Sequence, residues 1–100
     1  MNIVMVKNGK VELRKDTGSL IRTIVSSGAI NASINSDQTL ILVTTDKGKV
    51  ELRRDTGSLI RTIVSSGAVN ASFSGKDIIV NTSKGKTELR RESGSLIRSL

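Results

Sequence analysis

Short apolar runs, separated by polar turns about every ten residues, extend along the whole chain. The runs are rich in Val, Ile and Thr, and most are followed by a turn that contains glycine. Helices would need about 10–15 residues without such breaks, so the pattern predicts strands. The eleven expected strands cover residues 2–6, 10–14, 19–25, 29–34, 39–45, 49–54, 58–64, 68–73, 77–82, 86–91 and 95–100.

The chain repeats itself. The segment Gly9–Ser33 returns as Gly48–Ser72 with two of its 25 positions changed, and a more diverged copy fills Gly85–Leu100. The period is 39 residues and then 37, which is typical of solenoids, propellers and other repeat arrays. The near identity of two copies suits either recent gene amplification or deliberate design.

The Asp-Thr-Gly segments predict three-residue hairpin loops. In the second copy Gly57 falls where such a loop needs a positive φ angle. Pairing Arg54 with Ser58 across this loop sets the register of the two flanking strands. We therefore expect an opposite-charge pair across the strands of every copy: Glu12 with Arg22, Glu51 with Arg61, and Glu88 with Arg98.

Composition excludes much of the usual chemistry. Phe73 is the only aromatic residue, and the chain has no Trp, Tyr, His, Cys or Pro. A thiolate nucleophile, a disulfide, a zinc finger, an imidazole base and a haem ligand are therefore ruled out. Asp37 and Asp46 each lack a second carboxylate at calcium-ligand spacing. A Ser–Lys pair is the one nucleophilic arrangement left, and we expect neither catalysis nor a cofactor nor a metal.

Nothing in the chain predicts a membrane segment. The longest apolar run is residues 40–43, whereas a membrane-spanning helix needs about 20 residues. The amino-terminal segment is too short and too soon polar for a secretory signal. A cytoplasmic location is expected.

The segment Ala68–Leu100 resembles a β-propeller blade of the WD-repeat and quinoprotein-like kind. It reads as an inner strand A followed by strands B, C and D, with a Ser-x-x-Asp turn at 74–77 and a Gly-x-x-x-Leu step at 85–89. The Trp-Asp and Gly-His signatures of true WD repeats are absent. The resemblance implies an all-β propeller of four-stranded antiparallel blades and carries no function, because propellers host many functions. A β-trefoil, which also uses three four-stranded units, is the alternative.

In this frame residues 1–28 form a partial blade with strands B, C and D. Residues 29–67 and 68–100 form full blades, all within one repeat domain. Three blades cannot close a ring, since typical rings have about 4–8 blades, and both end faces would expose apolar residues. We expect homo-oligomerisation to complete the ring, as a six-bladed homodimer in preference to a nine-bladed homotrimer. Either the inner position of the first blade stays open, or the chain is a fragment of a longer repeat protein.

The chain is basic, with 16 Lys and Arg against 9 Asp and Glu, a net charge of +7. Each expected B–C turn is a glycine flanked by lysines, and these turns share one end of the ring. A polyanion such as nucleic acid or a sulfated glycan is therefore a candidate partner, bound without sequence preference. The alternative is that the lysines only keep the ring soluble. The candidate residues are Lys7, Lys10, Lys47, Lys49, Lys84 and Lys86.

The expected inner strands carry small residues. Period-two alternation puts Val69 and Ala71 on one face, and Ala68 and Asn70 on the other. Packing where the blades converge explains such residues, and the alternative is that Asn31 and Asn70 line a wet channel. The sequence therefore predicts a self-assembling propeller repeat protein of structural or interaction type, with polyanion binding as the alternative function.

Overall fold

The computed structural model describes all residues from 1 to 100, which form eleven β-strands and no helix long and apolar enough to cross a membrane. Each predicted strand is present, with ends that agree to within one residue. The strands are β1 (Asn2–Lys7), β2 (Lys10–Lys15), β3 (Leu20–Val25), β4 (Ala29–Ile34), β5 (Leu40–Thr45), β6 (Val50–Arg54), β7 (Leu59–Val64), β8 (Ala68–Ser74), β9 (Asp77–Thr82), β10 (Thr87–Arg90) and β11 (Leu96–Ser99).

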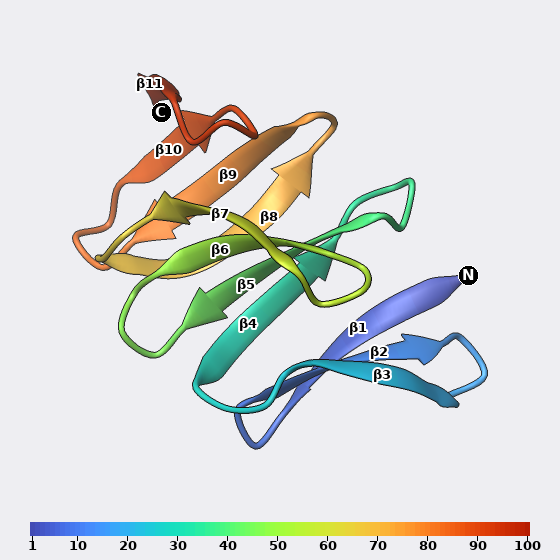
Figure 1. The fold of residues 1–100 in the computed structure, drawn as a ribbon. Helices are drawn as coiled ribbons and strands as arrows, with labels where there is room; N and C mark the ends of the chain where they lie inside the picture. The colour runs from blue at the N-terminus through green and yellow to red at the C-terminus, as the bar shows by residue number, and fades with distance from the viewer.

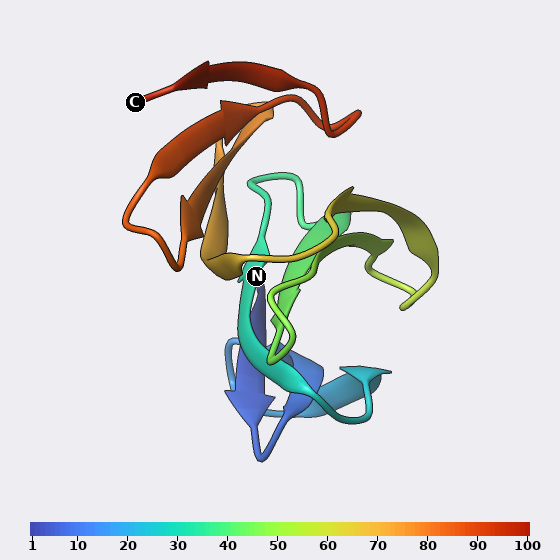
Figure 2. The ribbon, with the colours of Figure 1, turned by 90° about the vertical axis from the view of Figure 1, so that its left-hand side faces the viewer.

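The strands form three antiparallel sheets that follow one another along the chain (Figure 1). The first sheet has the order β1-β2-β3, the second β4-β5-β6-β7 and the third β8-β9-β10-β11. The sheets are arranged as a fan, with β1, β4 and β8 towards its inner side and β3, β7 and β11 on its outer side (Figure 2). Neighbouring sheets therefore meet face to face.

The hydrophobic core lies between the sheets as two separate clusters. Alternation along β5 supplies both: Ile41 and Val43 pack with Val11 of the first sheet, whereas Leu42 packs with Ile78 of the third. All five of these side chains have no exposed surface. The second sheet is thus buried on both faces, and the other two sheets are buried on one.

The Asp-Thr-Gly loops have the predicted form. The Arg54 nitrogen donates to the Ser58 carbonyl over 2.9 Å, and Gly57 has a φ angle of 98°. The ladder then skips Ile60, so that Leu52 lies opposite Arg61. The same bulge recurs in the other two sheets, and it moves every residue beyond it by one place. The predicted cross-strand Glu–Arg pairs are therefore wrong, because the bulge sets Glu12, Glu51 and Glu88 opposite Thr23, Thr62 and Ser99.

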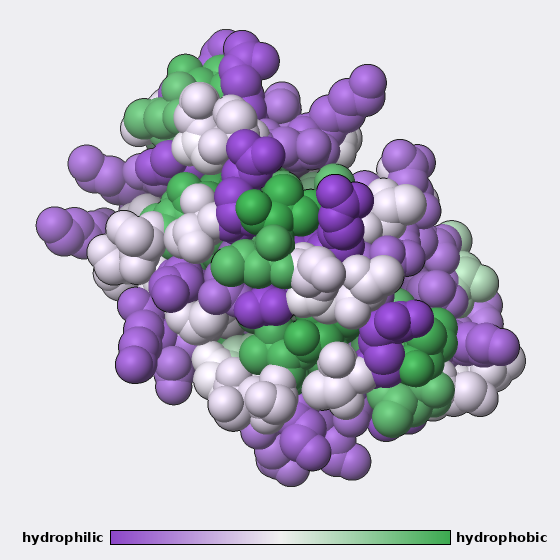
Figure 3. Space-filling model, in the orientation of Figure 1, coloured by the Kyte–Doolittle hydropathy of each residue, from purple (hydrophilic) through white to green (hydrophobic).

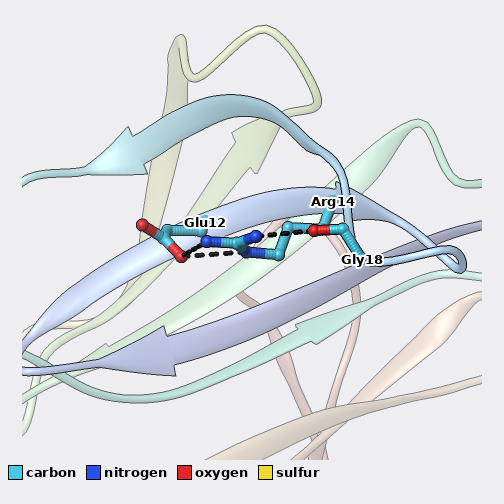
Figure 4. A network of polar contacts seen from close by, with 3 residues as sticks. All are labelled: Glu12, Arg14 and Gly18. Atoms are coloured by element: carbon cyan, nitrogen blue, oxygen red, sulfur yellow. Dashed lines mark hydrogen bonds and ion pairs between the residues drawn. The ribbon is translucent and has the colours of Figure 1, made fainter.

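Each glutamate pairs instead with an arginine two residues further along its own strand. The pairs are Glu12–Arg14 at 2.8 Å, Glu51–Arg53 at 3.0 Å and Glu88–Arg90 at 3.0 Å. The other end of each guanidinium donates to the glycine carbonyl of the following loop, as Figure 4 shows for Arg14 and Gly18. The arginine therefore ties the strand to its loop.

The inner strands also depart from simple alternation. In the pairing of β8 with β9, Ala68 lies opposite Thr82 and Asn70 opposite Asn81, so Val69 is an extra residue and is 47% exposed. The predicted division of faces is wrong here, because this bulge turns both Ala68 and Ala71 into the same core cluster.

Candidate functional site

The interface between the second and third sheets shows how one sheet covers the next. Leu42 and Leu52 of the second sheet are 0% and 2% exposed, and they pack against Ile78 and Val80 of the third. The repeat places Ile79 and Leu89 of the third sheet at the positions of Leu42 and Leu52. The face of the third sheet that points away from the second sheet therefore repeats the face of the second sheet that packs on the third.

No sheet covers this outer face of the third sheet, which we call the trailing face (Ile79, Leu89, Ile97 and Leu100). Ile79 and Leu89 are only half-buried there, and Leu100 is 68% exposed. Apolar surface is visible at the β11 end of the molecule in Figure 3 (upper left). The trailing face has the chemistry of a buried sheet interface without the sheet that buries it.

The opposite end of the molecule has the complementary face, which we call the leading face (Ile3, Met5, Glu12 and Arg14). Ile3 and Met5 occupy in β1 the positions that Ile41 and Val43 occupy in β5. They are 37% and 44% exposed, whereas their counterparts are fully buried. The Glu12–Arg14 pair drawn in Figure 4 lies on this face. Both halves of the repeated interface are thus present and uncovered.

The first sheet lacks an inner strand. β5 pairs with strands on both sides and so does β9, but β1 pairs only with β2. The other edge of β1 therefore has free backbone groups beside β4. Within residues 1–100, one strand position on the inner side is thus unfilled.

One end of the fan, which we call the lysine-rich end, is held together by backbone hydrogen bonds. It consists of the turns 7–10, 46–49 and 83–86 and the linkers 26–28 and 65–67. The carbonyls of Gly9 and Gly48 accept from the first residue of the following sheet at 3.0 Å. The carbonyls of Gly28 and Gly67 accept from Asp46 and Ser83 at 2.8 Å. The turns and linkers of adjacent sheets therefore form one continuous band.

The structure gathers the six candidate lysines on this band. Only Lys49 is half-buried, and the others are exposed. None of their amino groups forms an ion pair or a hydrogen bond within the chain. The positive charge at this end is therefore free to act on a ligand. The residues concerned are Lys7, Lys10, Lys47, Lys49, Lys84 and Lys86.

The two inner asparagines meet across the gap between their sheets. The Asn31 side-chain amide donates to the side-chain carbonyl of Asn70 and, at 3.4 Å, to the backbone carbonyl of Ala71. Asn70 is exposed. The two amides thus connect neighbouring inner strands while one of them faces solvent.

Sequence reasoning missed one feature of this end. Ser83 takes in the third sheet the place that Asp46 takes in the second, and Glu88 and Arg90 border a cavity beside it. In the sequence, the sign of this feature is one difference between two otherwise identical turns, which read DKGK at 46–49 and SKGK at 83–86.

Comparison with known proteins identifies the fold. No family model matches the chain, and no curated protein matches it in sequence. The chain is similar to the crystal structure of the WD40 β-propeller domain of Doa1, with a TM-score of 0.79 and 13% identity, over 98% of this chain and 36% of that one. It is also similar to BamB from Moraxella catarrhalis, with a TM-score of 0.75 and 17% identity, over 99% of this chain and 32% of that one.

The three sheets are therefore β-propeller blades, and the propeller prediction is confirmed over the β-trefoil alternative. The chain spans about a third of the length of each of these two proteins. At such low identity the likeness defines the fold alone.

Proposed function

We propose that this chain is a self-assembling β-propeller repeat protein of structural or interaction type, without catalytic activity. The trailing face of one chain packs on the leading face of the next, and two chains close a ring of six blades. The observation that carries this proposal is that each uncovered face repeats one side of an interface already buried inside the chain.

The packing of the internal interfaces supports this assembly. Leu89 of one chain would meet Ile3 and Met5 of another, as Leu52 meets Ile78 and Val80 within the chain. The contact is between two different faces, so it is head to tail, and its repetition gives a closed ring where the rotation per chain closes a full turn and an open filament where it does not. The fan of blades within the chain already turns in the sense that a propeller ring needs. Burial of apolar side chains supplies the driving force, at roughly 25 cal/mol per Å².

The number of blades favours two chains. Each chain supplies three sheets, and typical propellers have about 4–8 blades. Two chains give six blades, within this range, and three chains give nine, which lies outside it. The homodimer is therefore the proposed form and the homotrimer the alternative.

Substitutions on the two faces test the proposal. Leu89→Asp and Met5→Asp each place a carboxylate in the proposed interface, and we expect each variant to sediment as a folded monomer. Leu59→Asp is the matched control, because Leu59 is 51% exposed on the outer strand of the middle blade and belongs to neither face. Assembly that survives both face variants would overturn the proposal.

Mixing the two face variants sharpens this test. A Leu89→Asp chain keeps its leading face, and a Met5→Asp chain keeps its trailing face. An equimolar mixture should therefore form a heterodimer through one intact interface, more weakly than the unaltered protein. A symmetric contact between identical faces predicts no such rescue.

Polyanion binding is a second candidate function, favoured by the six unpaired lysines at one end. We expect salt-dependent retention of the protein on heparin or DNA. Changing Lys47, Lys49, Lys84 and Lys86 to Gln should abolish that retention and leave the oligomer intact. Unchanged retention would rule out the lysine-rich end as the binding surface.

A further inference from the structure

A cavity of about 380 Å³ lies between the second and third sheets at the lysine-rich end. Its lining residues come from the β9–β10 turn and the β7–β8 linker, which lie side by side in Figure 1. Its volume is at the small end of the range of ligand pockets, about 300–1,000 Å³. Eight of its nine lining residues are not hydrophobic, which favours a small polar ligand.

The cavity lining is cationic. Lys84, Lys86 and Arg90 line it against a single carboxylate, that of Glu88. Arg90 is already paired with Glu88 at 3.0 Å, so the two lysines carry the unbalanced charge. Ser66 and Ser83, each of which carries a hydroxyl group, also line the cavity. Two free ammonium groups beside hydroxyl donors suit a multiply charged oxyanion.

The equivalent junction between the first and second sheets provides an internal comparison. Asp46 stands there in place of Ser83, and its Oδ1 lies 3.8 Å from where a Cβ on Gly28 would be. Around Gly67, the counterpart of Gly28, the corresponding space is empty within 4 Å. The aspartate thus projects over the linker, adds a negative charge and takes up the space that is open at the other junction.

We infer that the junction between the second and third sheets is a binding site for a phosphate or sulfate group, held by Lys84 and Lys86. Ser83 is its specificity-determining residue. Its side chain is small and uncharged, so an anion can enter beside it. At the other junction Asp46 occupies the equivalent space and repels an anion with its negative charge. The site lies within one chain, so it exists whether or not chains close into a ring.

The test is a titration of the full chain with inorganic phosphate and inorganic sulfate, followed through the backbone amide NMR shifts. We expect saturable shifts at residues 66–67 and 83–86. Ser83→Asp should weaken binding at least about fivefold, since a carboxylate about 4 Å from the anion has this effect even at the dielectric constant of water. The fold tolerates Asp here, as Asp46 makes the same backbone bond that Ser83 makes.

Three further variants make the result specific. Lys84→Gln with Lys86→Gln should abolish the saturable shifts. Lys7→Gln with Lys10→Gln removes the same charge away from the cavity and should leave binding unchanged. Asp46→Ser should create a second set of saturable shifts at residues 27–28 and 46–49. Shifts spread equally over all lysine turns, or unaltered by Ser83→Asp, would overturn the site.

The bound phosphate group could be a free ion or the terminal group of a larger molecule. Titration with a phosphomonoester such as glycerol phosphate distinguishes these two sources. Binding as tight as that of free phosphate identifies a terminal group of a larger molecule as the ligand. Tighter binding of free phosphate identifies the ion itself. The absence of saturable shifts with every probe would refute the site, while the mass of the assembly separately tests ring closure.

Discussion

Gly48 packs against the backbone of Gly67 so closely that a Cβ atom on Gly48 would lie 2.5 Å from the Gly67 nitrogen. The turn of the second blade thus rests directly on the linker that leads into the third. Both glycines have φ angles above 80°, so the contact depends on glycine for its space and for its backbone conformation.

Gly48→Ala should destabilise the protein far more than the same change at Gly85. Both residues have φ angles near 80°, so each substitution costs about 1–2 kcal/mol for the left-handed conformation. Only Gly48 adds a collision with neighbouring backbone, because nothing lies within 4 Å of a Cβ at Gly85. Overpacking of this kind costs a further 1–3 kcal/mol or so. Urea denaturation measures the difference, and equal losses would contradict the packing described.

Thr44→Val should stabilise the protein. The Thr44 hydroxyl is buried and has no hydrogen-bond partner, and Val6 occupies the same position in the first blade. Removing a buried unsatisfied hydroxyl at constant shape gains roughly 1 kcal/mol. Thr62→Val, at an exposed position, is the control and should change the free energy of unfolding by less than about 0.5 kcal/mol.

The unfilled strand position predicts uneven hydrogen exchange. Of the β1 amides that point away from β2, only that of Asn2 has a partner, the side-chain carbonyl of Gln38 at 2.7 Å. Those of Val4 and Val6 have none and should exchange quickly, whereas β5 and β9 are bonded on both sides and should be protected. Mass spectrometry or NMR of the assembled protein measures this. Protection of β1 equal to that of β5 would mean that a strand from elsewhere fills the position.

Leu52→Ala and Leu89→Ala should differ in what they weaken. Leu52 is 2% exposed between two blades of one chain, so its truncation should cost about 2–5 kcal/mol of folding free energy. Leu89 holds the same place on the trailing face, half-buried, so its truncation should cost the isolated chain less. It should raise the dissociation constant of the dimer instead. A dimer unaffected by Leu89→Ala would argue against that face as the interface.

The strands and loops of this protein can be predicted from the sequence, because each depends on residues close together in the chain. Alternating Val, Ile and Leu between glycine turns defined the strands, and Gly57 marked the one positive φ of its loop. Local chemistry of this kind is present in the sequence itself.

The register of paired strands could not be predicted from the sequence, because it depends on bulges in β7 and β8. Ile60 and Val69 look like ordinary strand residues, yet the ladder skips each of them. A bulge bends its strand and increases the local twist, so its position depends on the pairing of two strands rather than on any one residue. Glu51 consequently bonds Arg53 beside it and not Arg61 across from it.

The candidate site could be predicted from the sequence only in part. The lysine turns could be placed at one end because the blade order determines the positions of its turns. The cavity at Ser83 could not, since it depends on how the β9–β10 turn meets the linker of another blade. In the structure Ser83 is bonded to Gly67, and Asp46 to Gly28. Only this pairing shows that the Asp-to-Ser difference between the turns changes the space beside each linker.

The mass of the unaltered protein in solution tests ring closure most directly. Light scattering after gel filtration should give twice the chain mass of 10.7 kDa, constant over a wide range of protein concentration, because a closed ring neither grows nor frays. A stable monomer of 10.7 kDa over the same range would contradict the proposal that the trailing and leading faces bind each other.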